Sequence, residues 1–115
     1  MMENCIFTKI IRKEIPAKIV HEDEQVLAFH DIRPQAPIHI LVIPKKELIS
    51  LEDLTPEDQM LVGHIYLTIQ KIARSMGFAE AGYRVVVNCR DDGGQEVPHL
   101  HFHLLAGRGL KWPPG

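Results

Sequence analysis

The chain has 115 residues, of which 45% are hydrophobic and 24% are charged, a composition that is ordinary for a soluble globular protein. This length predicts a single domain over residues 1–115, with 106–115 as a C-terminal tail, and allows burial of roughly 65% of the unfolded surface. Thirteen basic and 15 acidic residues give a net charge of −2, and the basic residues form no block larger than Lys45–Lys46. We therefore expect no binding to long nucleic acid, and any bound phosphate to be small and held locally.

The cysteines and the N-terminal residues indicate in which cellular compartment the protein is located. Cys5 and Cys89 are too few and too far apart for a disulfide framework or a cysteine zinc site, so each is predicted to be a small buried hydrophobe. Residues 1–4 lack the basic stretch and apolar core of a signal peptide, and no apolar run approaches the ~20 residues of a membrane span. We expect a cytoplasmic protein without membrane association.

In the first third of the chain, the apolar spacing over residues 6–11 predicts a short helix, which Pro16 ends. Residues 18–21 and 26–29 predict two strands that flank an acidic turn. An irregular proline-containing loop follows, and the apolar run 38–43 predicts a central strand. His39 interrupts this strand, and on its own such a histidine is most simply a core residue with a hydrogen-bond partner.

The main helix has the clearest signals. Thr55 can cap it, Pro56 suits its first turn, and Gly77 ends it. Its apolar stripe is predicted to face the core and consists of Leu61, Ile65, Leu67, Thr68, Ile72 and Met76.

The last two predicted strands cover residues 84–88 and 99–105, joined by the loop 89–97. Together with the preceding elements they predict an α+β domain: a mostly antiparallel, five-stranded sheet with one long and one short helix packed on one side of it.

Three histidines, His99, His101 and His103, stand at every second position of the last predicted strand. Because side chains alternate along a strand, the imidazoles share one face and the intervening apolar residues share the other. This pattern is compatible with a metal site, a nucleophilic site or a solvated structural face.

The metal hypothesis has a geometric limit. Neighbouring histidines, roughly 6.6 Å apart along the strand, can share one zinc ion at about 2.0–2.1 Å from each nitrogen, but His99 and His103 are about twice as far apart. His39 could complete a site, yet the chain holds no CxxC or HExxH motif.

The nucleophilic hypothesis uses more of the chain. A neutral imidazole can attack phosphorus and form a covalent intermediate when its other ring nitrogen is held by a hydrogen-bond partner. Upstream, Gly93–Gly94 offers backbone that can point amides at an anion, and Asn88 ends the preceding predicted strand. These residues favour phosphoryl chemistry and leave the other two hypotheses open.

Residues 99–105 read HLHFHLL, which resembles the signature of the histidine triad (HIT) family, three histidines that alternate with apolar residues. The resemblance extends over almost the entire chain and is to the nucleotide-binding, phosphoramidate-hydrolysing branch called Hint. Further matches lie at 6–7, 9–11, 14–17, 29–32, 34–37, 39, 43–45, 82–84, 88, 93–95 and 112–115.

This resemblance implies a HIT-like fold and a homodimer that binds purine nucleotide. The implied reaction is hydrolysis of purine nucleoside 5′-phosphoramidates to AMP or GMP through a covalent nucleotidyl-histidine intermediate. It implies no cofactor and no metal ion. His101 is implied as the nucleophile, His103 as the α-phosphate ligand, and His99 with His39 as the supporting histidines. Asp31 is implied at the ribose hydroxyls. The base pocket would consist of Phe7, Ile10, Phe29, Ile32 and Leu41, and the phosphate surroundings of Asn88, Gly94 and Gln95. Ile6 is predicted to be ordinary core.

Two residues depart from the family pattern. Glu96 stands where many animal members have a serine that helps protonate the leaving amine, and Pro98 stands where an aromatic residue often precedes the triad. A glutamate can bind or protonate an amine, although its charge also repels phosphate.

Two alternatives belong to other functional classes. Hydrolysis of dinucleoside polyphosphates, as in a sister branch, is disfavoured by Asn88, where that branch tends to have glutamine, and by the tail 112–115. A non-catalytic nucleotide-binding scaffold is disfavoured by the intact histidines.

Overall fold

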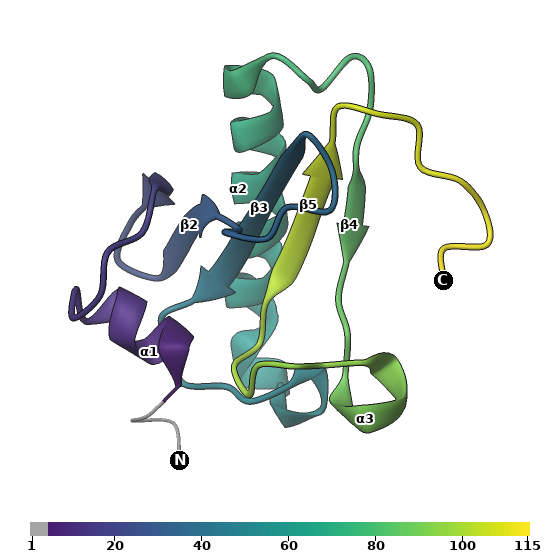
Figure 1. The fold of residues 1–115 in the computed structure, drawn as a ribbon. Helices are drawn as coiled ribbons and strands as arrows, with labels where there is room; N and C mark the ends of the chain where they lie inside the picture. The colour runs from purple at the N-terminus through teal and green to yellow at the C-terminus, as the bar shows by residue number, and fades with distance from the viewer. Residues whose placement is uncertain (1–4) are drawn as a thin grey trace.

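The computed structural model describes residues 5–115; residues 1–4, on which the expectation of no signal peptide depends, lie outside the described residues. Five strands form one sheet in the order β1-β2-β3-β5-β4, and every strand pairing found in the described part is antiparallel. In chain order the elements are α1 (Ile6–Ile11), β1 (Ile19–Glu22), β2 (Val26–His30), β3 (Ile38–Pro44), α2 (Gln59–Met76), β4 (Arg84–Val86), α3 (Arg90–Gly93) and β5 (Phe102–Ala106) (Figure 1).

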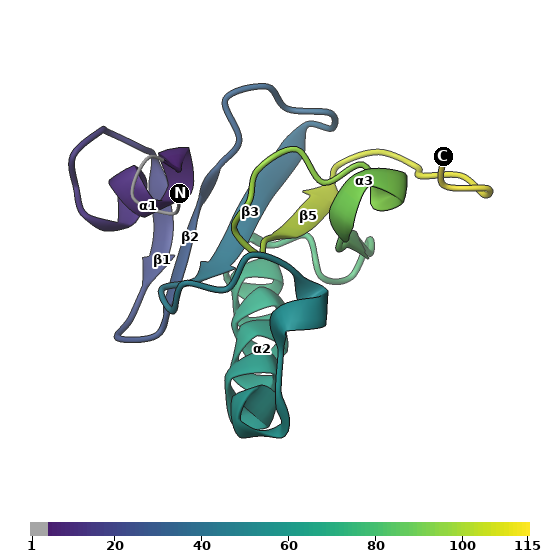
Figure 2. The same ribbon diagram turned by 90° about the horizontal axis from the view of Figure 1, so that it is seen from below.

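The helices cover both faces of the sheet, which corrects the expectation of packing on one side. Alternate residues of β2 and β3 belong to two separate clusters, one with α2 and one with α1. Figure 2 shows α2 below the sheet, whereas α1 lies away from α2 and next to β1 and β2. The physical reason is in the sequence: β2 and β3 are apolar at almost every position, so both faces of these strands need cover.

Helix α2 begins one turn later than its capping signal. Thr55 donates its N–H to Asp58 Oδ2 over 3.0 Å, and a 3-10 turn, Pro56–Asp58, leads into the helix. At the other end Gly77 adopts a positive φ of 85° and closes the last turn, as predicted.

The predicted apolar stripe of α2 is wrong at two positions. Leu67 is 65% exposed because it follows Ile65 by two residues, which turns it about 200° away from the core-facing side. Met76 is the last helical residue and is 42% exposed. Ile69 and Ala73 are buried instead.

The last two strands are shorter than predicted. Strand β4 ends at Val86, so Val87 and Asn88 lie beyond it, and β5 begins at Phe102, so His99 and His101 precede it. The predicted loop 89–97 contains the short helix α3. No helix in the described part of the chain is both long and apolar enough to span a bilayer.

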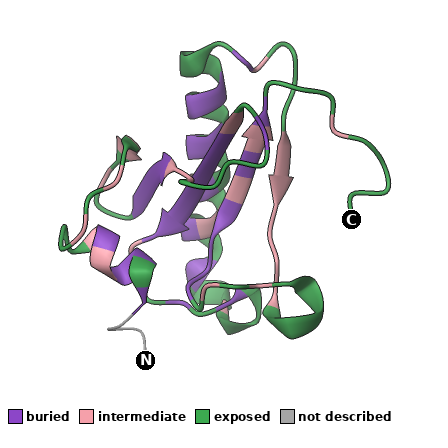
Figure 3. Cartoon of the chain, viewed as in Figure 1, coloured by how far each residue is buried: buried purple, intermediate pink, exposed green. Residues whose placement is uncertain are grey.

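The register of the central strands brings distant residues together. Strand β3 pairs with β5 so that Leu41 faces His103 and His39 faces Leu105. His39 and His103, separated by 64 positions in the sequence, thereby become diagonal neighbours on one face. Strand β3 is buried at nearly every position and β5 at alternate positions, whereas α3 is exposed and the C-terminal segment is mostly exposed (Figure 3).

Candidate active site

A cleft of about 900 Å³ opens on the α1 face of the sheet. Most of the residues that the resemblance implies line this one cleft: Phe7, Ile10, Phe29, Asp31, Ile32, His39, Leu41, Asn88, Glu96, His101 and His103. The structure places His99, Gly94 and Gln95 outside its lining.

His101 presents one free ring nitrogen to the cleft. Its Nδ1–H donates to the carbonyl oxygen of His99 over 2.7 Å, which leaves the lone pair on Nε2. Among residues 5–115, no hydrogen bond to Nε2 is found, although the side chain is only 5% exposed. Burial lowers the pKa of His101 below its ordinary value, against the opposing effects of the His99 carbonyl, Asp31 and Glu96. At neutral pH, His101 is therefore an uncharged imidazole with a lone pair available for attack.

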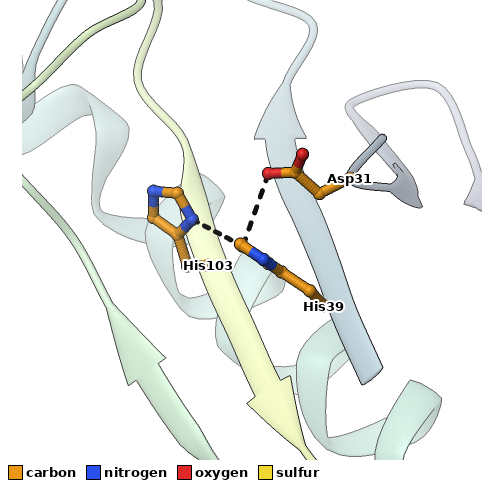
Figure 4. Close-up of side chains that lie close together, drawn as sticks. All are labelled: Asp31, His39 and His103. Carbon is orange, nitrogen blue, oxygen red and sulfur yellow. Dashed lines mark hydrogen bonds and ion pairs between the residues drawn. The ribbon is translucent and has the colours of Figure 1, made fainter. Parts of the chain in front are cut away.

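The tautomers of His39 and His103 follow from a chain of hydrogen bonds. The backbone N–H of Gln35 donates to His39 Nδ1 over 3.0 Å, so the proton of a neutral His39 must be on Nε2. His39 Nε2 lies 2.9 Å from His103 Nδ1, to which it donates, and 3.5 Å from Asp31 Oδ2 (Figure 4). His103 therefore accepts through Nδ1 and carries its own proton on Nε2.

His103 is consequently a neutral hydrogen-bond donor. Burial, together with the neighbouring His101 and His39, lowers the pKa of His103 from 6.5 to about 4. Burial also lowers the pKa of His39, although the charge of Asp31 opposes this. Beside the lone pair of His101, the cleft thus holds an N–H group that can bind an oxygen of a phosphoryl group.

The same tautomers bear on the metal hypothesis. Asp31, His39 and His103 each offer a ligand atom within 4.8 Å of the others. However, His39 Nδ1 already accepts a hydrogen bond, so its Nε2 carries a proton and has no lone pair for a metal ion. The arrangement fits a proton-ordered hydrogen-bond chain and does not fit a divalent cation.

His99 acts behind the cleft. Its ring is fully buried, and Nε2–H donates to the carbonyl oxygen of Pro44 over 2.7 Å. Its own carbonyl orients His101. His99 therefore connects the end of β3 to the nucleophile candidate without entering the cleft.

The loop that carries Gln35 is held by the segment after β5. Arg108 Nη2–H donates to the Gln35 carbonyl over 2.9 Å. Gly107 has a φ of 95°, and a Cβ there would lie 2.8 Å from Pro37 Cβ, so only glycine allows this approach. Sequence reasoning missed these contacts because the partners are far apart in the chain and neither Gly107 nor Arg108 belongs to a motif.

One end of the cleft is apolar. The ring of Phe7 packs edge-on against His101, with centroids 5.1 Å apart, and against Phe29 at 5.6 Å. Ile6 is 45% exposed and lines the cleft, so the prediction that it is ordinary core is wrong. Ile32 stands 87% exposed at the rim. The cleft is also lined by residues for which the sequence predicted no role in the site: Ile15, Pro16, Ala17, His30, Arg33, Gln35 and Val97.

Gln95 and Gly94 shape the α3 loop. Gln95 Oε1 accepts the N–H of Arg90 over 2.9 Å, and its Nε2 donates to the carbonyls of Ile49 at 2.6 Å and Val97 at 3.0 Å. Gly94 has a φ of 76° and ends α3. In this structure the Gln95 amide therefore fixes the loop, and its groups are already engaged.

Comparison with known proteins agrees with this geometry. The HIT domain model matches residues 12–110. An uncharacterized HIT-like protein of Synechococcus elongatus is 57% identical over 115 residues and covers all of both chains.

Solved structures extend the similarity to the fold. A HIT family hydrolase from Legionella pneumophila has a TM-score of 0.95 at 51% identity, covering 97% of this chain and 100% of that chain. A histidine triad protein from Clostridium difficile has a TM-score of 0.91 at 53% identity, covering 94% of each chain. The HIT-like fold is thus confirmed, and the chain belongs to the HIT domain family.

Proposed function

We propose that this protein belongs to the Hint branch and hydrolyses purine nucleoside 5′-phosphoramidates, releasing AMP or GMP and an amine. The observation that carries the proposal is the state of the two imidazoles in the cleft. His101 offers a neutral nitrogen with a free lone pair, and His103 beside it offers a neutral N–H donor.

The lining of the cleft supports a nucleoside on one side of these histidines. The base lies against the apolar end near α1, where Phe7, Ile10 and Phe29 provide flat and aliphatic surface. Asp31 Oδ1 accepts the N–H of Arg33 over 2.8 Å, and the carboxylate has further lone pairs for the ribose hydroxyls.

In the first chemical step His101 Nε2 attacks the α-phosphorus, and the phosphorus–nitrogen bond breaks. His103 Nε2–H stabilises the charge on a phosphoryl oxygen. The departing amine must gain a proton, and the Glu96 carboxylate on the cleft wall can relay one from solvent water to the leaving nitrogen.

In the second step water attacks phosphorus, the bond to His101 Nε2 breaks, and the nucleoside monophosphate leaves. The proton lost by the attacking water passes through the Glu96 carboxylate to solvent, so the imidazole ends neutral and Glu96 ends as a carboxylate. Every group in this scheme comes from the chain itself, so the reaction requires no cofactor or metal ion.

A homodimer is part of the same proposal. Met60 and Leu67 are seven residues apart, which places them on one side of α2, and they are 88% and 65% exposed. Exposed apolar side chains grouped on one helix favour a contact with a second copy. Light scattering of the purified protein measures its mass, and the value of a single chain would contradict this part of the proposal.

The decisive test is release of AMP from adenosine 5′-phosphoramidate, with and without a chelator. His101→Ala is compared with His21→Ala, a histidine on β1 outside the cleft. Turnover that resists the chelator and is lost only in His101→Ala supports the proposal. Binding of AMP without turnover would favour a scaffold, and preferential cleavage of a dinucleoside polyphosphate would favour the sister activity.

A further inference from the structure

A second hollow, of about 720 Å³, lies against α3 outside the cleft. We call it the α3 hollow; it is lined by Ile49, Cys89, Arg90, Asp91, Asp92, Gln95, Glu96 and Pro98. Cys89 is half-buried on its wall, so the prediction of a buried cysteine is correct for Cys5 and wrong for Cys89.

The α3 hollow and the cleft share one lining residue. Glu96 lines both. Its charge also acts on the pKa of His101, which places the carboxylate within electrostatic reach of the nucleophile candidate. A substituent on phosphorus that reaches Glu96 therefore also reaches the wall of the α3 hollow.

Hydrogen bonds of one side chain connect the backbone around the α3 hollow. The side-chain amide of Gln95 joins three segments: the start of α3, the stretch after β3, and Val97. Because these three hydrogen bonds connect backbone groups around the hollow, the folded chain holds this backbone in place without a ligand.

The arrangement of the cleft assigns a direction to the substrate. Its apolar end lies at α1, and Asn88 and Glu96 belong to its lining on the side of α3. In Figures 1 and 2, α1 and α3 lie on opposite sides of β3 and β5. With the nucleoside at α1 and phosphorus at His101, the remaining substituent on phosphorus is directed toward α3.

The charge of the α3 hollow selects among such substituents. Asp91, Asp92 and Glu96 contribute three negative charges to its lining, and Arg90 contributes one positive charge. In the part of the chain that the structure describes, none of the ion pairs found includes these four residues. The excess negative charge remains available to a ligand.

We propose that the α3 hollow receives the leaving amine and favours amines that carry a second, positively charged group, such as diamines. This inference rests on the proposed function, because it needs a substituent on phosphorus beyond the nucleoside. The reaction is unchanged: the phosphorus–nitrogen bond breaks, the nitrogen gains one proton, and the second ammonium group stays protonated throughout.

The test compares three adenosine 5′-phosphoramidates of similar size. Their amines are 1,2-diaminoethane, which is cationic, propylamine, which is neutral, and β-alanine, which is anionic. A carboxylate at an exposed site contributes modestly, so we expect kcat/KM for the cationic amine to exceed that for the neutral one roughly 3- to 10-fold, with the anionic amine lowest. The preference should decrease with added salt.

Paired variants locate the effect. The double substitution Asp91→Asn with Asp92→Asn should bring the cationic-to-neutral ratio close to one, while kcat/KM for the propylamine substrate stays the same, which shows that the loop is intact. The matched control, Glu24→Gln with Glu80→Gln, removes two exposed carboxylates outside both hollows and should leave the ratio unchanged.

A binding measurement separates this inference from the proposed function. Two adenosine 5′-phosphonates, 3-aminopropyl and butyl, replace the leaving nitrogen by carbon and resist cleavage. We expect the aminopropyl compound to bind more tightly in the wild type and equally in the Asp91→Asn, Asp92→Asn variant. Charge-dependent binding without turnover of any phosphoramidate would overturn the proposed function alone. Turnover without dependence on amine charge would overturn the α3 hollow proposal alone.

Discussion

The two faces of the sheet are built from the same strands and differ in what covers them. On one face Leu100, Phe102 and Leu104 are at most 1% exposed beneath the 18-residue helix α2. On the other face the six-residue helix α1 covers β2 and β3 and leaves His101 and His103 beside an open cleft. The alternation of one strand therefore separates residues that stabilise the fold from residues available for chemistry.

The largest expected effect comes from the cleft face. His101→Ala removes the proposed nucleophile and should lower kcat for phosphoramidate hydrolysis by at least about 10⁴-fold. Because a single buried hydrogen bond is lost, the free energy of unfolding should fall by only about 1–3 kcal/mol. Single-turnover kinetics and urea unfolding measure the two effects, and a variant with near-normal turnover would rule out His101 as the nucleophile.

The α2 face should show the opposite response. Phe102→Ala removes a ring that is 1% exposed and packs edge-on against Tyr66 at 5.5 Å, which should cost about 3–5 kcal/mol of unfolding free energy. The folded fraction should keep kcat/KM within a few-fold of the wild type. If Phe102→Ala does not fold, Phe102→Leu provides a milder variant, and a large loss of kcat in either folded variant would contradict the separation of the two faces.

Acid should lower the free energy of unfolding mainly through the histidines of the cleft face. Burial lowers the pKa of His103 to about 4, and it also lowers those of His101 and His39 from their ordinary value of 6.5. Between 6.5 and about 4 the unfolded chain binds protons that the folded chain does not, so the free energy of unfolding decreases as pH falls through this window. Denaturant unfolding across this window should show that the free energy of unfolding changes less with pH in His103→Gln than in the wild type. Equal slopes of unfolding free energy against pH would contradict the lowered pKa of His103.

The smallest effect should come from the loop that orders the tautomers. Arg108→Ala removes the hydrogen bond to the Gln35 carbonyl and should lower kcat about 3- to 10-fold with little change in KM. Nitrogen NMR should show a mixture of His39 tautomers, which a purely structural contact would not produce. Arg108→Lys retains a donor and should recover part of the loss, whereas Arg74→Ala on α2 serves as the control. Unchanged tautomers in Arg108→Ala would exclude this positioning role.

Much of the sheet could be predicted because its signals are local. The period of two correctly assigned the two faces of residues 99–104, even though β5 begins only at Phe102, because His99 and His101 both contact Phe7 and His103 lines the same cleft. Thr55 and Gly77 marked the ends of the main helical segment because capping depends on residues next to the cap. Leu67 was misplaced because its apolar character was given more weight than its spacing of two residues from Ile65, which turns it away from the core.

The sequence by itself determined the HIT family, the antiparallel α+β fold and the alternation that places histidines opposite apolar residues, because these depend on residue type and short-range spacing. Only the tertiary structure decided which nitrogen of each histidine is free. That choice depends on the Gln35 N–H, the His99 carbonyl and the Pro44 carbonyl. Backbone donors and acceptors exist at every position, so their pairing with a particular ring is determined by strand register and loop packing across the fold.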